Sequence, residues 1–135
     1  MGRGAAHTGG ERVSKISNLV GNRLDWAVAI AIGEKNPQIS FGGGVCVVSH
    51  GHTQHRFLPS EEWSHGGPLI ERFKVDFSSN HENGYEARCD DGQATGWQSG
   101  PTPLIAICRA VVAAKLGETV EMSDGFRDAQ EEAKP

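Results

Sequence analysis

Apolar residues recur every three or four positions near the C-terminal end of the chain, which is the spacing of one helix face. Thr102 precedes this segment as a good N-cap, and Pro103 fits the first helical position, where no amide hydrogen is needed. Gly117 supplies a stop signal. The pattern predicts a core helix over residues 103–116. Its periodic apolar positions are Leu104, Ile105, Cys108, Val111, Val112 and Leu116.

A second segment with helical spacing lies nearer the N-terminus and predicts a helix over residues 22–32. Asn22 is expected to cap it and Gly33 to end it. Trp26 falls within this helix and is predicted to belong to the core. The apolar positions that repeat are Leu24, Ala27, Val28, Ala31 and Ile32.

Shorter apolar stretches separated by glycine and proline predict strands between the two helices. Strands are expected at residues 38–41 and 45–49, around a glycine turn at 42–44, and at residues 69–77 and 84–89. Residues 50–55 are expected to form a loop or the exit of a strand, and residues 59–68 and 90–100 to form loops. The predicted fold class is α+β: a small mixed or antiparallel sheet packed against the two helices, 22–32 and 103–116.

Length and composition restrict the class of protein. A chain of 135 residues is long enough for one domain with a core. Residues 1–16 are expected to be a flexible N-terminal tail, residues 17–122 the globular domain, and residues 123–135 an acidic flexible C-terminal tail. The net charge of −4 disfavours binding to nucleic acid, which requires a basic surface. No signal segment and no membrane-spanning apolar run are expected, which indicates a cytoplasmic protein.

Arg109 is the one charged residue between positions 101 and 114, so its guanidinium is expected to need a partner. A helical side chain leans towards the N-terminus, and the first turn of a helix presents free amides that attract anions. Arg109 and this turn together predict a site for a phosphate or carboxylate. The alternative is an internal salt bridge, for instance to Asp25 or Glu71.

Two of the three tryptophans, Trp63 and Trp97, fall in predicted loops, where an aromatic ring either stacks on a flat ligand or covers the core. The histidines of residues 50–55 have a spacing that permits metal binding, but no cysteine pair with zinc-finger spacing accompanies them. They are interpreted as a solvated loop. The three cysteines are expected to be reduced small apolar residues.

Catalytic motifs are not found in the sequence. Ser60 and Ser64 lack the strand, elbow and helix of a serine nucleophile. Glu61 and Glu62 are adjacent acids that are expected to be solvated, and the glycines at 42–44 are not followed by the Lys and Ser or Thr of a phosphate-binding loop. The sequence therefore predicts a protein that is not an enzyme.

Three ordered segments resemble the NinX family of tailed phages, a family without an assigned activity. They are Leu-Asp-Trp-Ala-Val-Ala at residues 24–29, Trp-Ser-His-Gly-Gly-Pro-Leu-Ile-Glu-Arg at residues 63–72, and Gly-Pro-Thr-Pro-Leu-Ile at residues 100–105, continued by Arg109, Lys115, Leu116 and Gly117. The resemblance covers about residues 17–122. The sequence departs from the family in its longer N-terminal tail, its histidines at 50–55, and Tyr85, where relatives often carry tryptophan. The resemblance implies a phage or prophage accessory protein that acts in the host cell cytoplasm.

We predict a non-enzymatic protein that binds a small anionic, nucleotide-like ligand, since aromatic faces suit a base and a helix N-terminus with arginines suits phosphates. An anti-defence sponge that sequesters a cyclic nucleotide or a cyclic ADP-ribose type immune signal fits this chemistry. A homo-oligomer is expected, without cofactor or metal. The alternative is a protein-interaction module that inhibits or redirects a host or phage replication or defence protein. The predicted ligand-binding residues are Trp63, Gly66, Gly67, Pro68, Arg72, Trp97, Gly100, Thr102 and Arg109.

Overall fold

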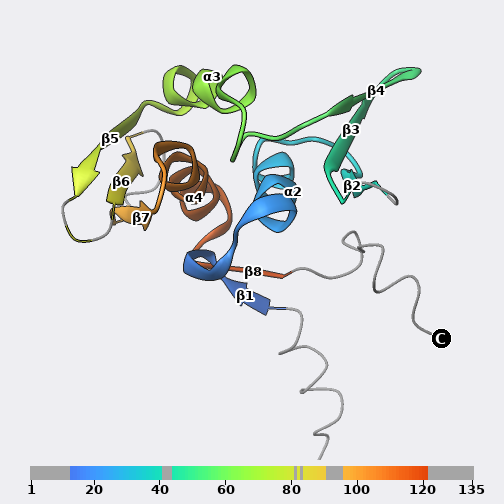
Figure 1. The fold of residues 1–135 in the computed structure, drawn as a ribbon. Helices are drawn as coiled ribbons and strands as arrows, with labels where there is room; N and C mark the ends of the chain where they lie inside the picture. The colour runs from blue at the N-terminus through green and yellow to red at the C-terminus, as the bar shows by residue number, and fades with distance from the viewer. Residues whose placement is uncertain (1–12, 41–43, 81, 83, 91–95, 122–135) are drawn as a thin grey trace, which may run out of the picture.

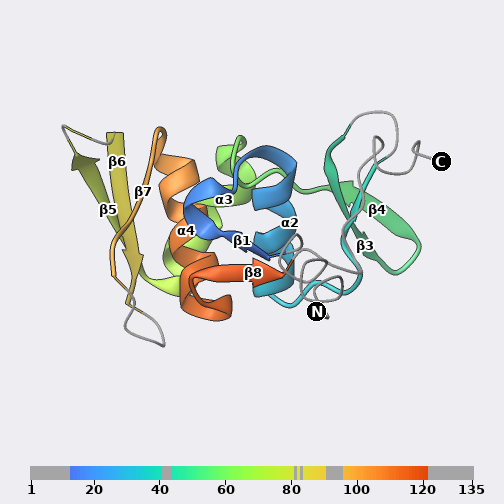
Figure 2. The ribbon, with the colours of Figure 1, turned by 90° about the horizontal axis from the view of Figure 1, so that it is seen from below.

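The computed structural model describes residues 13–40, 44–80, 82, 84–90 and 96–121. Within these residues the chain forms three α-helices, one short 3-10 helix and three small antiparallel sheets. The helices form a layer between the two three-stranded sheets, which lie at opposite ends of the molecule (Figures 1 and 2). The predicted α+β class is confirmed, with a third helix in addition to the two expected.

Helix α4 (Pro103–Leu116) is the central element of the core. Thr102 caps it as predicted, since its Oγ1 accepts a hydrogen bond of 3.1 Å from the amide of Ile105. Gly117 ends it with a φ of 96°. Ten of its fourteen residues are buried, because the helix packs against α2, α3 and the sheet β5–β6–β7. An apolar stripe on one face predicted this helix, but it is buried on nearly all sides.

Helix α2 (Gly21–Ala31) confirms the second helical pattern. Asn22 does not cap it, because Val20 is the N-cap residue. The side-chain amide Nδ2 of Asn22 instead donates to the carbonyl of Gly44 at 2.7 Å. Asn22 therefore braces the segment that leads into β3 (Cys46–His50). Trp26 is buried as predicted, and its indole N–H donates to the carbonyl of Pro37 at 3.0 Å.

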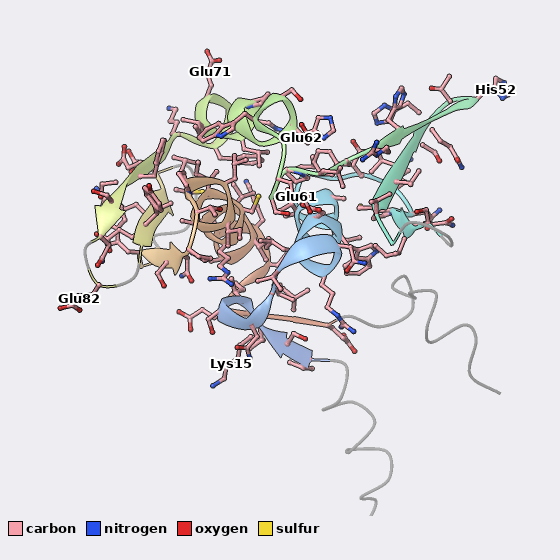
Figure 3. All side chains as sticks on the ribbon, in the orientation of Figure 1. Lys15, His52, Glu61, Glu62, Glu71 and Glu82 are labelled. Carbon is pink, nitrogen blue, oxygen red and sulfur yellow. The ribbon has the colours of Figure 1, made fainter. Side chains whose placement is uncertain are left out.

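One three-stranded sheet has the order β2–β3–β4. Strand β2 (Gln38–Ile39) pairs with β3, as the two expected strands predicted, and residues 41–43 of the expected turn lie outside the described residues. The loop expected at residues 50–55 is wrong in its second half. β3 and β4 (Thr53–Arg56) form a hairpin that turns at Gly51, where φ is 66°. This hairpin extends away from the helical layer, with His52 at its tip (Figure 3).

The largest error of the sequence prediction concerns α3 (Trp63–Phe73), which replaces the expected loop at 59–68 and the first part of the expected strand at 69–77. Two glycines and Pro68 within a helix oppose its formation locally. Tertiary packing overrides this preference, because Leu69 and Phe73 are buried in the core. The helix ends at Lys74, which adopts the left-handed conformation with φ of 54°.

The second three-stranded sheet has the order β5–β6–β7. Strand β6 (Gly84–Cys89) matches its prediction, while β5 (Val75–Asn80) starts later than expected. Strand β7 (Gln98–Gly100) lies in the interval expected to be a loop, and residues 91–95 of that interval are outside the described part of the chain.

A two-stranded sheet pairs the two ends of the described chain. Strand β1 (Val13–Lys15) runs antiparallel to β8 (Thr119–Glu121) and leads into the 3-10 helix η1 (Ile16–Asn18). Ile16 is buried in the core. The structured domain thus starts before residue 17, where the expected N-terminal tail ended, and the expected C-terminal tail at 123–135 lies outside the described residues.

Candidate functional site

Arg109 is held by the backbone of the protein itself. Arg109 is only 7% exposed, and its Nε and Nη2 donate to the carbonyl of Leu19 at 3.2 and 3.1 Å. Nη1 donates to the carbonyl of Ser99 at 2.8 Å. Burial lowers the pKa of this guanidinium from its ordinary value. Arg109 therefore ties the entry of α2 and strand β7 to the central helix.

The internal salt bridge considered for Arg109 is wrong for both of its named partners. The Oδ1 atom of Asp25 instead accepts a hydrogen bond from the amide of Ser60. Glu71 points away from the body of the molecule on α3 (Figure 3). Two backbone carbonyls satisfy the guanidinium where the sequence suggested a carboxylate or a ligand anion.

The first turn of α4 has little amide capacity left for an anion. Pro103 has no N–H, and the amide of Ile105 is bound by Thr102. Gly100 packs directly on this turn: a Cβ atom there would lie 2.8 Å from the amide nitrogen of Ala106. Gly100 is thus required for close packing between β7 and α4. This packing explains why the residue is glycine, and no bound ligand is needed to explain it.

The predicted site residues of α3 lie at opposite ends of that helix and have different roles. At the N-terminal end Trp63 is 52% exposed, and a Cβ atom at Gly67 would lie 3.8 Å from its ring. Gly66 is needed for packing, because a Cβ atom there would lie 2.4 Å from the carbonyl oxygen of Pro59 and 2.8 Å from Leu104. A real Cβ atom never approaches that closely, so α3 requires glycine at this position.

At the C-terminal end of α3, Arg72 stabilises helix ends. Its Nη2 donates to the carbonyl of Ile32 at the end of α2 at 3.2 Å, and its guanidinium lies 5.0 Å from the ring centre of Phe73. Lys115, from the last turn of α4, lies 5.2 Å from the same ring. The C-termini of three helices meet here, and cations offset the partial negative charge of such ends. Arg72 is nine positions after Trp63, which corresponds to a rise of about 14 Å along the helix axis.

Trp97 directly precedes the edge strand β7 and is 45% exposed. The guanidinium of Arg88 lies 4.9 Å from its ring centre, and Arg88 also forms an ion pair of 3.6 Å with Asp76. No described ring contact connects Trp97 with Trp63. The predicted site residues therefore lie in several separate places: the start of α3, the meeting point of the helix ends, and the packing around α4.

A groove that the sequence prediction missed lies between β4 and the start of α3. It has a volume of about 530 Å³. Figure 3 shows Glu62 on the side of α3 that faces the hairpin. The only signal for this groove in the sequence was the polar, histidine-rich segment at 50–55. The groove itself could not be predicted, because a tertiary contact brings residues 54–56 beside residues 62–65. The lining residues are Gln54, His55, Arg56, Leu58, Glu62 and His65.

The two histidines of the groove are held by hydrogen bonds to the chain. The amide of Leu58 donates to Nδ1 of His65 at 2.9 Å, and the ring of His65 stacks on Phe57 with 6.1 Å between centres. His55 Nε2 lies 3.0 Å from the hydroxyl of Thr53. Both rings are therefore fixed in orientation before any ligand arrives.

A buried carboxyl group anchors the segment between β4 and α3. Asp25 is 1% exposed, and its Oδ1 accepts a hydrogen bond of 2.8 Å from the amide of Ser60. Its Oδ2 and the hydroxyl of Ser60 are buried without a hydrogen-bond partner. Burial raises the pKa of Asp25 to about 6, against the lowering effect of Ser60. Asp25 thus fixes the segment that carries Leu58 and Glu62.

The cysteines lie in the core. Burial raises the pKa of Cys46 to about 12 and that of Cys108 well above its ordinary value, so both remain thiols at neutral pH. In the described part of the chain, no three His, Cys, Asp or Glu residues come together as a metal site. Nε2 of His50 instead lies 3.0 Å from the carboxylate of Glu34.

Comparison with known proteins places the chain by family alone. The model of the family described as "Bacteriophage P22, NinX" matches residues 15–115. No curated protein matches the chain. None of the described helices combines the length and the apolar character needed to cross a membrane.

Proposed function

The chain belongs to the phage P22 NinX family, and we propose that it is a phage accessory protein that binds a small anionic, nucleotide-like ligand without converting it. The site proposed is the groove between β4 and α3. A sponge of this kind would sequester an immune signal such as a cyclic nucleotide or a cyclic ADP-ribose type molecule. In this proposal the protein acts in the host cytoplasm as a homo-oligomer, without a cofactor.

The observation that carries the proposal is the chemistry of the groove. Arg56 supplies a cation that no described ion pair neutralises, and it suits a phosphate oxygen. The carboxylate of Glu62 suits the hydroxyl groups of a ribose, and the side chain of Leu58 supplies apolar surface. Trp63, the one predicted site residue retained here, exposes its ring one position after Glu62.

The charges in the groove indicate the kind of phosphate. The opposite charges of Arg56 and Glu62 offset one another, so a ligand with many negative charges is disfavoured. A phosphodiester carries one negative charge per phosphate, whereas a terminal phosphate carries nearly two at neutral pH. A cyclic nucleotide therefore fits the groove better than a nucleoside triphosphate.

Binding without conversion is proposed because the cysteine thiols and the hydroxyl of Ser60 do not line the groove. The thiols of Cys46 and Cys108 are buried and protonated. The hydroxyl of Ser60 is buried beside the carboxyl group of Asp25 and does not line the groove. A protein that sequesters a signal needs affinity alone.

Thermal-shift measurements and calorimetry with cyclic AMP, cyclic di-AMP, cyclic ADP-ribose and AMP test the proposal. We expect at least one to raise the Tm, and Arg56→Ala to weaken its Kd about tenfold through loss of a charge-assisted hydrogen bond. Lys35→Ala is the matched control, since it removes an exposed cation outside the groove lining. Chromatography of the released ligand should recover it unchanged. The absence of binding by all four nucleotides would refute the proposal.

A second candidate is a protein-interaction module, which the exposure of Trp63 and Trp97 favours. Exposed tryptophans are typical anchors of protein interfaces. Capture of a defined host or phage protein that is lost in Trp63→Ala or Trp97→Ala, together with no response to nucleotides, would support this function over ligand binding.

A further inference from the structure

The hydrogen bonds of His65 determine where its proton lies. The amide of Leu58 can only donate, so Nδ1 of His65 must accept. In the neutral ring the proton is then on Nε2. Because His65 lines the groove and Nδ1 is occupied by the backbone, the group that His65 can offer to a ligand is an N–H donor.

The hydrogen bonds of Thr53 determine where the proton of His55 lies. The hydroxyl of Thr53 donates its one hydrogen to the carbonyl of His50 at 2.9 Å. That hydroxyl can therefore only accept from Nε2 of His55, 3.0 Å away. In the neutral ring the proton of His55 is on Nε2, and Nδ1 keeps a free lone pair. The group that His55 can offer to a ligand is an acceptor.

We infer that His65 and His55 recognise the base of the nucleotide, with His65 as donor and His55 as acceptor. The inference rests on the proposed function and specifies what the groove distinguishes. The edge of a nucleobase presents an acceptor beside a donor, as the N1 and the amino group of adenine do. A sugar phosphate without a base offers only rotatable hydroxyl groups in place of this fixed, planar pair. The two histidines thus make the groove selective for base-bearing ligands over other small phosphates.

Rigid rings strengthen this recognition. The stack on Phe57 and the bond from Leu58 orient His65, and Thr53 orients His55. A pre-oriented donor or acceptor loses less freedom on binding than a mobile one. Arg56, which the proposed function assigns to the phosphate, follows His55 in β4 and also lines the groove.

Paired amide substitutions separate recognition from structural support. Asparagine places a polar atom near the position of Nδ1, whereas glutamine reaches the position of Nε2. His65→Asn keeps the acceptor for Leu58 and loses the donor at Nε2, while His65→Gln does the reverse. His55→Gln keeps the contact with Thr53 and loses the acceptor at Nδ1, while His55→Asn does the reverse.

The experiment measures the Kd of each variant for AMP and for ribose 5-phosphate, which carry the same terminal phosphate. We expect His65→Asn and His55→Gln to lower the preference for AMP about threefold to tenfold, the value of one hydrogen bond. His65→Gln and His55→Asn should retain more of the preference than those two variants, because they keep the ligand-facing atom and lose only the orienting bond. His65→Gln should have the lower Tm of the His65 pair, because it loses the bond from Leu58.

The outcomes distinguish this inference from the proposed function. If AMP binds and all four variants keep the preference of the original protein, or if His65→Gln and His55→Asn lose it instead, base recognition by these atoms is refuted while ligand binding stands. If a cyclic nucleotide of the thermal-shift panel binds and AMP does not, the Kd values of the four variants for that nucleotide decide in the same way. If no nucleotide of the panel binds, both are refuted.

Discussion

The central helix α4 and the groove between β4 and α3 each contain an arginine, but the two regions differ in what satisfies its charge. Arg109 on α4 is buried and donates to the carbonyls of Leu19 and Ser99. Arg56 in the groove is exposed and forms no described ion pair. The first guanidinium supports the fold, and the second is available to a ligand.

This difference shows that an isolated charge in an apolar helix does not by itself indicate a site. A buried guanidinium needs acceptors, and backbone carbonyls of neighbouring segments provide them as well as a ligand does. Four predictions test this comparison, from the largest expected effect to the smallest.

Arg109→Ala should destabilise the protein by about 4 kcal/mol, because the buried carbonyl of Leu19 loses both of its donors and a long side chain leaves the core. Urea denaturation measures the change. Arg109→Lys should recover part of the loss, since its ammonium reaches one of the carbonyls. A loss below about 1 kcal/mol in Arg109→Ala would show that this arginine is not structural.

Asp25→Asn should change the pH dependence of stability. The folded-state pKa of Asp25 is raised from 3.8 to about 6 by burial, so the folded protein holds this proton more tightly than the unfolded chain. The stabilisation is present below pH 4 and is lost as pH rises through about 6, by about 3 kcal/mol at most.

In this comparison the asparagine keeps the acceptor for Ser60 and carries no charge. Denaturation curves between pH 4.5 and 7.5 should therefore show the variant gaining about 2 kcal/mol over the original protein as pH rises. Glu71→Gln, at an exposed carboxylate, is the control. Parallel curves for Asp25→Asn and the original protein would contradict the assigned titration.

Gly66→Ala should cost about 2 kcal/mol, because its Cβ atom would collide with the carbonyl of Pro59 and with Leu104. Gly67→Ala, one position along the same helix, meets only the ring of Trp63 at 3.8 Å and should gain up to about 1 kcal/mol. Thermal denaturation of the two variants gives the contrast. Equal effects would mean that the closeness of α3 to α4 does not determine the need for glycine.

Arg56→Ala should have the smallest effect on stability, within about 0.5 kcal/mol, since an exposed side chain without a described ion pair contributes little. The substitution should instead weaken the Kd for the ligand. Urea denaturation without a ligand, beside Lys35→Ala, measures the change in stability. A loss comparable with that of Arg109→Ala would remove the distinction between the two regions.

The sequence by itself determined the elements whose signals are local. The Thr102 cap, the Pro103 start and the Gly117 stop define α4, and the resemblance carried by three short segments agrees with the family match. Strand β6 and the positions of β2 and β3 also followed from short apolar stretches between turn residues. These features depend on contacts within a few residues, which propensity and periodicity describe directly.

Only the tertiary structure decided α3, the partners of Arg109 and the groove. Two glycines and a proline disfavour a helix locally, and Gly66 is required because Pro59 and Leu104 approach it from other parts of the fold. The carbonyls that bind Arg109 come from residues 19 and 99, ninety and ten positions away. The groove joins a strand to the helix that follows it. Such contacts depend on how elements pack, and no local pattern specifies that packing.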